Sequence, residues 1–437
     1  MTDWADHVAG DHPEKGNGTG PHGEQRGDAR VESGALSYAP LLPSWEEGDK
    51  GGHLVVNIGP QHPSTHGVLR LVVELEGERV VRLEPVIGYL HTGVEKSFEH
   101  QRYTQGITLT DRLDYLSPQF NGLAFVMAAE RLLEIEPPPR AQYARVILCE
   151  LTRIASHLVW LGTHAIDIGA MSMLLYCFRE RELILDIHEM VSGARMMASY
   201  FRIGGLAQDL PDGFGEAVRE FNTLLPERME DYETLLTENP IWLERTKGVG
   251  IINAEQALAH SVTGPILRAA GTPWDIRKEF PYSSYDHFDF DVPTQQEGDT
   301  YARYLVRMAE IRESLKIIAQ ALDRLPDGPV LVADYKIAPP PKEEIYLSME
   351  ALIHHFKFWT EGVRIPAGEA YSCVESPRGE LGVYMVSDGS AKPWRVHFRG
   401  PSFANLQALA LAAEGGLIAD LVALVASLDP VLGDVDR

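Results

Sequence analysis

The sequence predicts an α+β protein in which a central helical bundle is flanked by strand elements near the N-terminus and in the C-terminal third. Two observations carry this prediction. Runs rich in β-branched residues lie at 53–86 and again near 368–400, whereas apolar residues recur at helical spacing across about 117–325. No internal repeat with a period of 20–50 residues is visible, so a solenoid is not expected.

Composition divides the chain into two parts. Residues 1–50 are rich in Gly, Asp, Glu, His and Pro and poor in large apolar residues. Burial in such a segment cannot repay the entropy of ordering, so we predict a disordered N-terminal tail. Residues 51–437 are expected to form one ordered domain, with strands over 53–86, the helical bundle, and further strands and helices over 340–437.

The ordered part is expected to begin with a β-hairpin. Strands are predicted at roughly 53–59 and 67–76, and a turn at Glu76–Gly77 leads into a third strand near 79–86. The connection between the first two strands reads GPQHPSTHG and contains His62 and His66. Imidazoles are unusual at a hairpin tip, where Asn-Gly is the common choice, so this loop is a candidate for function.

Long helices are expected to make up the bundle. The helix that begins at Pro139 is apolar over more than half its circumference, so we place it at the centre. Residues 240–300 are mixed in pattern. The predicted helices are 117–134 with Ser117 as N-cap, the helix from Pro139, 172–200, 212–237, 298–325, 348–358, 402–413 and 416–426.

The charge balance excludes some partners. The chain of 437 residues has 63 Asp and Glu against 39 Lys and Arg, for a formal net charge of −24. Nucleic acid and anionic lipid both need a basic face, so neither is expected as a direct partner. Three widely spaced cysteines indicate a reducing compartment, and neither a signal peptide nor a run of 18 uncharged apolar residues is apparent.

The common cofactor motifs are absent from the sequence. There is no GxGxxG or GxxxxGK[ST] pattern and no HExxH. His62 and His66 have HxxxH spacing, but Pro63 disfavours the helix that would align them on one face. Cys149 and Cys177 fit apolar helix patterns and are interpreted as core residues. We therefore predict no metal site in this chain.

Three polar features are candidates for a functional site. The stretch DRLDY contains Arg112, Asp114 and Tyr115 just before a buried helix, and the His66 loop is the second feature. The third is Asp167, near the end of the most apolar helix. A carboxylate there must be paired or functional, because burying it alone is costly. A structural ion pair with an arginine is the alternative interpretation of Asp167.

Long blocks of the sequence resemble one known family. The blocks include NIGPQHPSTHGVLRLVVELEGE, IGYLHTGVEKSFEH, DRLDYLSP, HAIDIGAM, SGARM, SMEALIHHFK, ESPRGELGVYMVSDG and DPVLGDVDR. In this order they resemble the D-type subunit of proton-pumping NADH:quinone oxidoreductase, respiratory complex I. The resemblance runs from about residue 53 to Arg437 and leaves out the tail.

This family is in turn similar to the large subunit of nickel–iron hydrogenases, which implies a fold of that type. Hydrogenases bind nickel and iron through two CxxC pairs. The segments at 112–117 and 429–434 stand where those pairs would be, and neither contains cysteine. The resemblance therefore implies no metal in this chain, and a cavity that holds a quinone head instead.

The resemblance also implies roles for individual residues. His66 and Tyr115 would hydrogen-bond the two quinone carbonyls as proton donors, and Asp167 would face His66 and tune its charge. His62 would contribute to quinone binding from the same loop. Arg112 would lie beside a 4Fe–4S cluster held by a neighbouring protein, where a fixed cation stabilises the reduced state.

Met197 marks a departure from the family. Many members have a histidine after SGARM, close to the partner's cluster, and this sequence has Met197 there. A thioether cannot titrate. The substitution therefore predicts a low-potential cluster with weak pH dependence, which favours menaquinone over ubiquinone as the substrate. In the alternative interpretation, Met197 packs in the helix core and another group titrates.

The resulting prediction is a quinone-site subunit of a proton-translocating NADH:quinone oxidoreductase, peripheral on the cytoplasmic side of the cell membrane. Expected partners within complex I are the subunit with the terminal 4Fe–4S cluster, the homologue of the C-type subunit, and the membrane subunit that forms the quinone entrance. A non-catalytic scaffold subunit of a hydrogenase-like membrane complex is the alternative, and a stand-alone metalloenzyme is a third.

Overall fold

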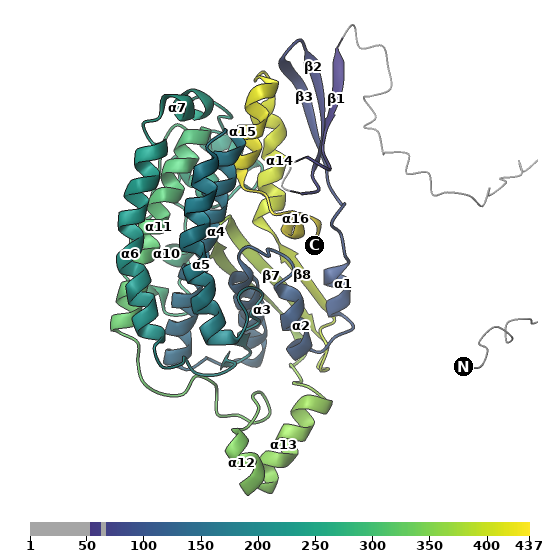
Figure 1. Ribbon diagram of the computed structural model, residues 1–437. Coiled ribbons are helices and arrows are strands. Elements are labelled where there is room, and N and C mark those ends of the chain that lie inside the picture. The colour runs from purple at the N-terminus through teal and green to yellow at the C-terminus, as the bar shows by residue number, and fades with distance from the viewer. Residues whose placement is uncertain (1–52, 63–66) are drawn as a thin grey trace, which may run out of the picture. The chain divides into compact units, whose positions relative to one another are not determined.

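The computed structural model describes residues 53–62 and 67–437. The predicted tail over 1–50 and the loop residue His66 lie outside the described residues. The predicted α+β class is confirmed, because helices are combined with small antiparallel sheets near the start and in the last third of the described chain (Figure 1).

The first sheet is an antiparallel meander of β1 (Leu54–Ile58), β2 (Arg70–Glu76) and β3 (Arg79–Val86). Its apolar side chains pack with those of α14 (Pro401–Ala413) and α15 (Ile418–Leu428) in one core cluster. Strands from one end of the domain are thus stabilised by helices from the other, which lie beside them in Figure 1.

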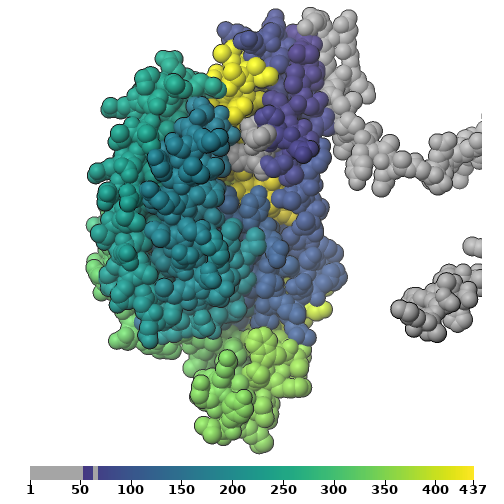
Figure 2. Space-filling model, viewed as in Figure 1, coloured from purple at the N-terminus to yellow at the C-terminus, as the bar shows by residue number. Residues whose placement is uncertain are grey.

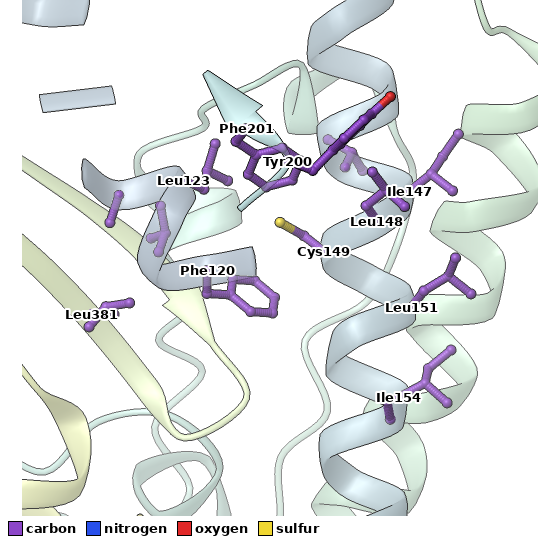
Figure 3. Packing of buried hydrophobic residues seen from close by; sticks show 14 of the residues in the cluster. Phe120, Leu123, Ile147, Leu148, Cys149, Leu151, Ile154, Tyr200, Phe201 and Leu381 are labelled. Carbon is purple, nitrogen blue, oxygen red and sulfur yellow. The ribbon is translucent and has the colours of Figure 1, made fainter. Parts of the chain in front are cut away.

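The bundle is built around α4 (Pro139–Asp167), which begins at Pro139 as expected. Every residue from Tyr143 to Gly162 is buried. Its neighbours in space include α5 (Met171–Ser192) and α11 (Thr300–Asp323). Figure 3 shows the Cys149 thiol between the aromatic rings of neighbouring segments, and burial raises its pKa well above the usual range. Cys149 is a core residue.

Among the described residues, α4 is the one helix whose length and composition would allow it to cross a membrane. In its most apolar window, 94% of the residues are buried inside the protein. The apolar surface of α4 therefore packs against its own chain.

The helix expected over 172–200 is shorter than predicted. It ends at Ser192, because Gly193 adopts a left-handed conformation with φ of 79°. Further left-handed backbone at Met197 and Ser199 leads into the two-residue strands β4 (Phe201–Arg202) and β5 (Gly205–Leu206). Apolar spacing continued past Gly193, but the turn residues decided the boundary.

The other expected long elements form with boundaries shifted by a few residues. The segment 240–300, predicted as mixed, forms several short helices. The remaining bounds are α1 Val94–Phe98, α2 Tyr103–Thr110, α3 Pro118–Leu133, α6 Phe214–Leu236, α7 Pro240–Thr246, α8 Ala254–Ala259, α9 Pro265–Ala269, α10 Ile276–Glu279, η2 Tyr285–His287, α12 Lys342–Leu347, α13 Met349–Thr360, β6 Gly368–Ser376, β7 Gly379–Ser387, β8 Arg395–Arg399 and α16 Leu432–Asp436.

A buried network of charges ties α4 to α10, η2 and α11, and reaches β6 through the Arg153 Nη2 hydrogen bond to the Glu375 carbonyl oxygen at 2.6 Å. Glu150 on α4 accepts hydrogen bonds from Arg277 Nη1 at 3.2 Å, Tyr285 Oη at 2.6 Å and Ser314 Oγ at 2.6 Å. It also pairs with Arg153 at 3.1 Å. The pKa of Glu150 falls to about 2, because these cations and hydroxyls outweigh the opposing effect of burial.

We predict that Glu150→Ala destabilises the protein by about 3–5 kcal/mol, because it leaves buried guanidinium groups uncompensated. Because the folded pKa of Glu150 lies below its unfolded value, its contribution is present above about pH 4.5 and is lost as the pH falls toward 2. Chemical denaturation at several pH values measures both effects. Glu227→Ala, on the exposed face of α6, is the control and should change little.

Candidate functional site

The DRLDY segment forms the turn between α2 and α3. Asp114 Oδ1 accepts hydrogen bonds from the backbone N–H groups of Leu116 at 3.1 Å and Ser117 at 3.2 Å. The Ser117 hydroxyl donates to Asp114 Oδ2, and no side-chain cap bond to α3 forms. Ser117 occupies the N-cap position as predicted, but its hydroxyl fixes the turn that carries Tyr115.

A buried arginine binds the carboxylate of Asp114 in this turn. Arg378, in the tight turn between β6 and β7, pairs with Asp114 Oδ2 at 2.8 Å and with Asp429 Oδ2 at 3.0 Å. Its Nη1 also donates to Ser156 Oγ on α4 at 3.0 Å. All four residues are buried. Arg378 therefore fixes the relative positions of the DRLDY turn, α4 and the C-terminal segment.

The C-terminal segment packs closely against Tyr115. A Cβ atom added at Gly433 would lie 2.2 Å from the Leu113 carbonyl oxygen and 3.2 Å from Tyr115 Cδ1. Glycine is thus required at this contact, and it lets the backbone of α16 support the tyrosine ring. Burial, followed by the nearby Asp114 carboxylate, raises the pKa of the adjacent Asp434 to about 6.

Tyr115 borders a small cavity of about 20 Å³, which has room for about one water molecule. Side chains from α3, α4, α5 and the loop after α5 complete the lining. The lining residues are Tyr115, Leu116, Pro118, Gln119, Thr152, Ala155, Arg181, Leu185, His188, Arg195, Met196, Met197 and Ala198. The cavity thus joins Tyr115 and Met197, which are far apart in sequence.

The polar groups of this cavity are kept neutral or cationic. Burial and then Asp114 raise the pKa of Tyr115, so its hydroxyl retains its proton at neutral pH. Burial and then Arg181 lower the pKa of His188 to about 4. His188 Nδ1 accepts from Gln119 Nε2 at 3.4 Å, which leaves Nε2–H to face Thr152 Oγ1 at 3.3 Å. His188 is therefore a neutral imidazole.

The loop carrying Met197 is anchored to the same turn. Ser199 donates from its backbone N–H at 3.0 Å and from its hydroxyl at 2.5 Å to Asp111 Oδ2. Met197 has a φ of 55°, in the left-handed region that few side chains adopt. The half-buried Met197 therefore faces the cavity from a loop and not from a helix core.

The other predicted residues lie away from this cavity. Arg112 and His62 are exposed. Asp167 comes 12 residues after the cavity residue Ala155 on α4, which corresponds to about 18 Å along the helix axis. Since His66 lies outside the described residues, its contact with Asp167 stays a prediction.

Asp167 itself is half-buried at the end of α4. Burial raises its pKa to about 6. Within residues 53–62 and 67–437, no ion pair involves Asp167. This part of the chain therefore does not provide the structural arginine partner that was the alternative interpretation of Asp167.

A search for metal ligands gives no candidate in the described part of the chain. No group of three or more His, Cys, Asp or Glu side chains there is arranged to hold a metal ion. In the two segments predicted to correspond to the hydrogenase CxxC pairs, Asp114 pairs with Arg378 and Asp434 accepts the Ser402 N–H at 2.9 Å.

Comparison with known proteins defines the class. Residues 167–437 match the family described as "Respiratory-chain NADH dehydrogenase, 49 Kd subunit". The chain is 63% identical over 387 residues to the D-type subunit numbered 2 of the NADH-quinone oxidoreductase of Roseiflexus sp. (strain RS-1), covering 88% of this chain and 93% of that protein. It is 57% identical over 384 residues to the D-type subunit of the NADH-quinone oxidoreductase of Geotalea uraniireducens (strain Rf4), covering 88% of this chain and 98% of that protein.

The protein is thus of the respiratory-chain NADH dehydrogenase 49-kDa type. More specifically, the chain belongs to the family of D-type subunits of NADH-quinone oxidoreductase, part of the oxidoreductase complex I, as the resemblance predicted.

Sequence reasoning did not identify several residues that shape this site. Arg378, Gly433 and His188 carry no recognisable signal by themselves. The first two lie in the motifs ESPRGE and DPVLGD, which belong to blocks of the family resemblance. Their role depends on contacts between residues more than 200 positions apart, such as Arg378 with Asp114.

We predict that Asp167→Asn does not destabilise the protein. Above pH 6 the substitution should raise the free energy of unfolding by on the order of 1 kcal/mol. The raised pKa means that the folded state favours protonated Asp167, so its charge lowers stability as the pH rises from about 4 to 6. Denaturation curves of the unmodified protein and of the Asp167→Asn variant at pH 5 and pH 7.5 measure this difference. A loss of several kcal/mol at both values would instead reveal an essential ion pair.

Proposed function

We propose that this chain forms, together with a neighbouring protein that holds a 4Fe–4S cluster, the chamber in which the NADH-quinone oxidoreductase reduces quinone. The observation that supports this most is the position of Tyr115. Its protonated hydroxyl belongs to a side chain at the edge of a cavity, on a turn held by Arg378 and Gly433. Names of the similar proteins state the same overall reaction.

Reduction of a quinone to a quinol consumes two electrons and two protons, and each carbonyl oxygen becomes a hydroxyl. The partner's cluster would supply the electrons one at a time. Tyr115 would donate a hydrogen bond to one carbonyl oxygen, and His66 would donate to the other from the β1–β2 loop. A histidine pKa near 6.5 suits proton transfer at neutral pH. His62 would help to hold the quinone from the same loop.

Asp167 would act on this reaction through His66. A carboxylate facing an imidazole favours its protonated form, and the raised pKa of Asp167 allows it to gain or lose a proton near pH 6. Arg112, which is exposed, would face the partner's cluster.

The assembly we propose places the protein at the cytoplasmic side of the cell membrane as a peripheral part of the complex. Its partners would be the subunit with the terminal 4Fe–4S cluster, the homologue of the C-type subunit, and the membrane subunit that forms the quinone entrance. Quinone reduction would be coupled to proton translocation by the complex as a whole.

The Tyr115 role has a direct test in the purified complex. Tyr115→Phe and His66→Ala should each lower NADH:quinone activity by about 10²-fold or more, because each removes a proton donor. NADH:ferricyanide activity should be unchanged, because ferricyanide accepts electrons upstream of the quinone site. Tyr384→Phe, on β7, is the control. Full quinone activity in both variants would favour a scaffold role, and loss of both activities would indicate failed assembly.

Met197 gives a second test. A unit charge several ångströms from the cluster is worth roughly a few kcal/mol at an effective dielectric of about 20. Without a titrating group at this position, the cluster potential should be low and nearly independent of pH around neutrality, which favours menaquinone. Redox titration followed by EPR should give a slope well below about 60 mV per pH unit, and Met197→His should restore it. A full slope in the unmodified protein would refute the argument.

A further inference from the structure

The helices α12 and α13 form a helical hairpin that stands out from the rest of the domain (Figures 1 and 2). No residue of α12 is buried, and α13 buries only Ala351 and Phe358. Ser348 separates the two helices and accepts a hydrogen bond from the Ala351 N–H at 3.3 Å. The hairpin therefore has almost no core of its own.

The hairpin also has little support from the domain. A cavity of about 700 Å³ lies beside α13, lined by polar side chains such as Tyr335, Lys336 and Arg364. A direct polar contact to the domain runs from Arg102 Nη1 to the Trp359 carbonyl oxygen at 2.9 Å, at the end of α13. An isolated helix as short as α12 is marginal in water. Contacts with α13 and with Tyr335, whose hydroxyl donates to Glu344, support it, and a partner surface would stabilise it further.

The outward surface of the hairpin is apolar. On α13, exposed residues follow the spacing 349, 352, 356 and 359, which places them along one helical face. We define the apolar face of the hairpin as Tyr346, Leu347, Met349, Leu352, Phe356 and Trp359, all of which are more than half exposed.

The size of this face is that of a protein interface. Large apolar side chains carry roughly 200 Å² of surface each, so the exposed parts of six such residues amount to on the order of 800 Å². A standard protein–protein interface buries about 800 Å² on each partner. Isolated apolar patches on monomers are mostly smaller, at roughly 300–600 Å².

Charges around this face define the chemistry of the partner. The two helices carry three acidic residues, Glu343, Glu344 and Glu350, and two basic ones, Lys342 and Lys357; with Glu361 directly after α13, the formal charge over 342–361 is −2. The whole chain is acidic as well, at −24. A complementary surface would be apolar at its centre and basic at its rim.

From this geometry, we infer that the apolar face of the hairpin is covered in the assembled oxidoreductase by an apolar, basic-rimmed surface of another protein of the complex. The inference goes beyond the proposed function, because no residue of the face lines the Tyr115 cavity. It also differs from a quinone or membrane contact in requiring a protein partner.

Site-specific crosslinking tests the inference in the intact purified complex. A photoreactive benzoylphenylalanine replaces Phe356, which is 65% exposed, or Phe280, which is 63% exposed and lies on a different part of the domain. Irradiation at position 356 should give a crosslink to another protein of the complex, at a segment that mass spectrometry shows to combine apolar and basic residues. A crosslink to residues 1–52 of the same chain, to a second copy or to lipid would overturn the inference, as would no crosslink.

A charge substitution gives the second measurement. Phe356→Glu should lower the yield of assembled complex at least about tenfold, as expected for a central interface residue, while the thermal unfolding of the isolated full chain stays unchanged. Phe280→Glu is the matched control and should leave the yield within about twofold. Normal yield of the Phe356→Glu complex would overturn the inference. This experiment measures the yield of assembled complex and not its activity. Its result is therefore independent of whether Tyr115 has the proposed catalytic role.

Discussion

The candidate site depends on the interactions of one buried guanidinium group, that of Arg378. It bonds to Asp114 in the turn before α3, to Ser156 on α4 and to Asp429 before α16. A buried cation is costly unless it is paired, and here two carboxylates and a hydroxyl compensate it. Because its partners come from separate segments, the pairing is complete only when all of them have reached their final positions.

Tyr115, in the DRLDY turn, is packed against α16 on one side and borders the cavity on the other. Gly433 leaves no space between α16 and the Tyr115 ring, and the Asp114 bonds fix the backbone of the turn. On the other side of Tyr115, the cavity is lined by the loop that carries Met197. A proton donor held in this way keeps its orientation while a substrate binds, which is the arrangement that catalysis by hydrogen bonding requires.

The charges of the domain are organised in two different ways. In the interior, Glu150 and its arginine partners form a compensated network that joins α4 to α10 and α11. Asp434 on α16 and Asp167 at the end of α4 form no side-chain ion pair within the described residues, and burial raises the pKa of each to about 6. Groups of the second kind can change charge near neutral pH, whereas groups of the first kind stabilise the fold.

The sequence by itself determined the α+β class, the approximate bounds of the long helices and strands, the burial of Cys149 and the place of the DRLDY segment directly before the buried helix α3. These features follow from local periodicity and turn residues, which act over a few positions. The tertiary structure alone decided that Met197 meets Tyr115 at one cavity, and that Arg378 and Gly433 support that tyrosine. Such contacts join residues separated by up to several hundred positions, and hydrophobic patterning carries no information on which distant side chains will meet.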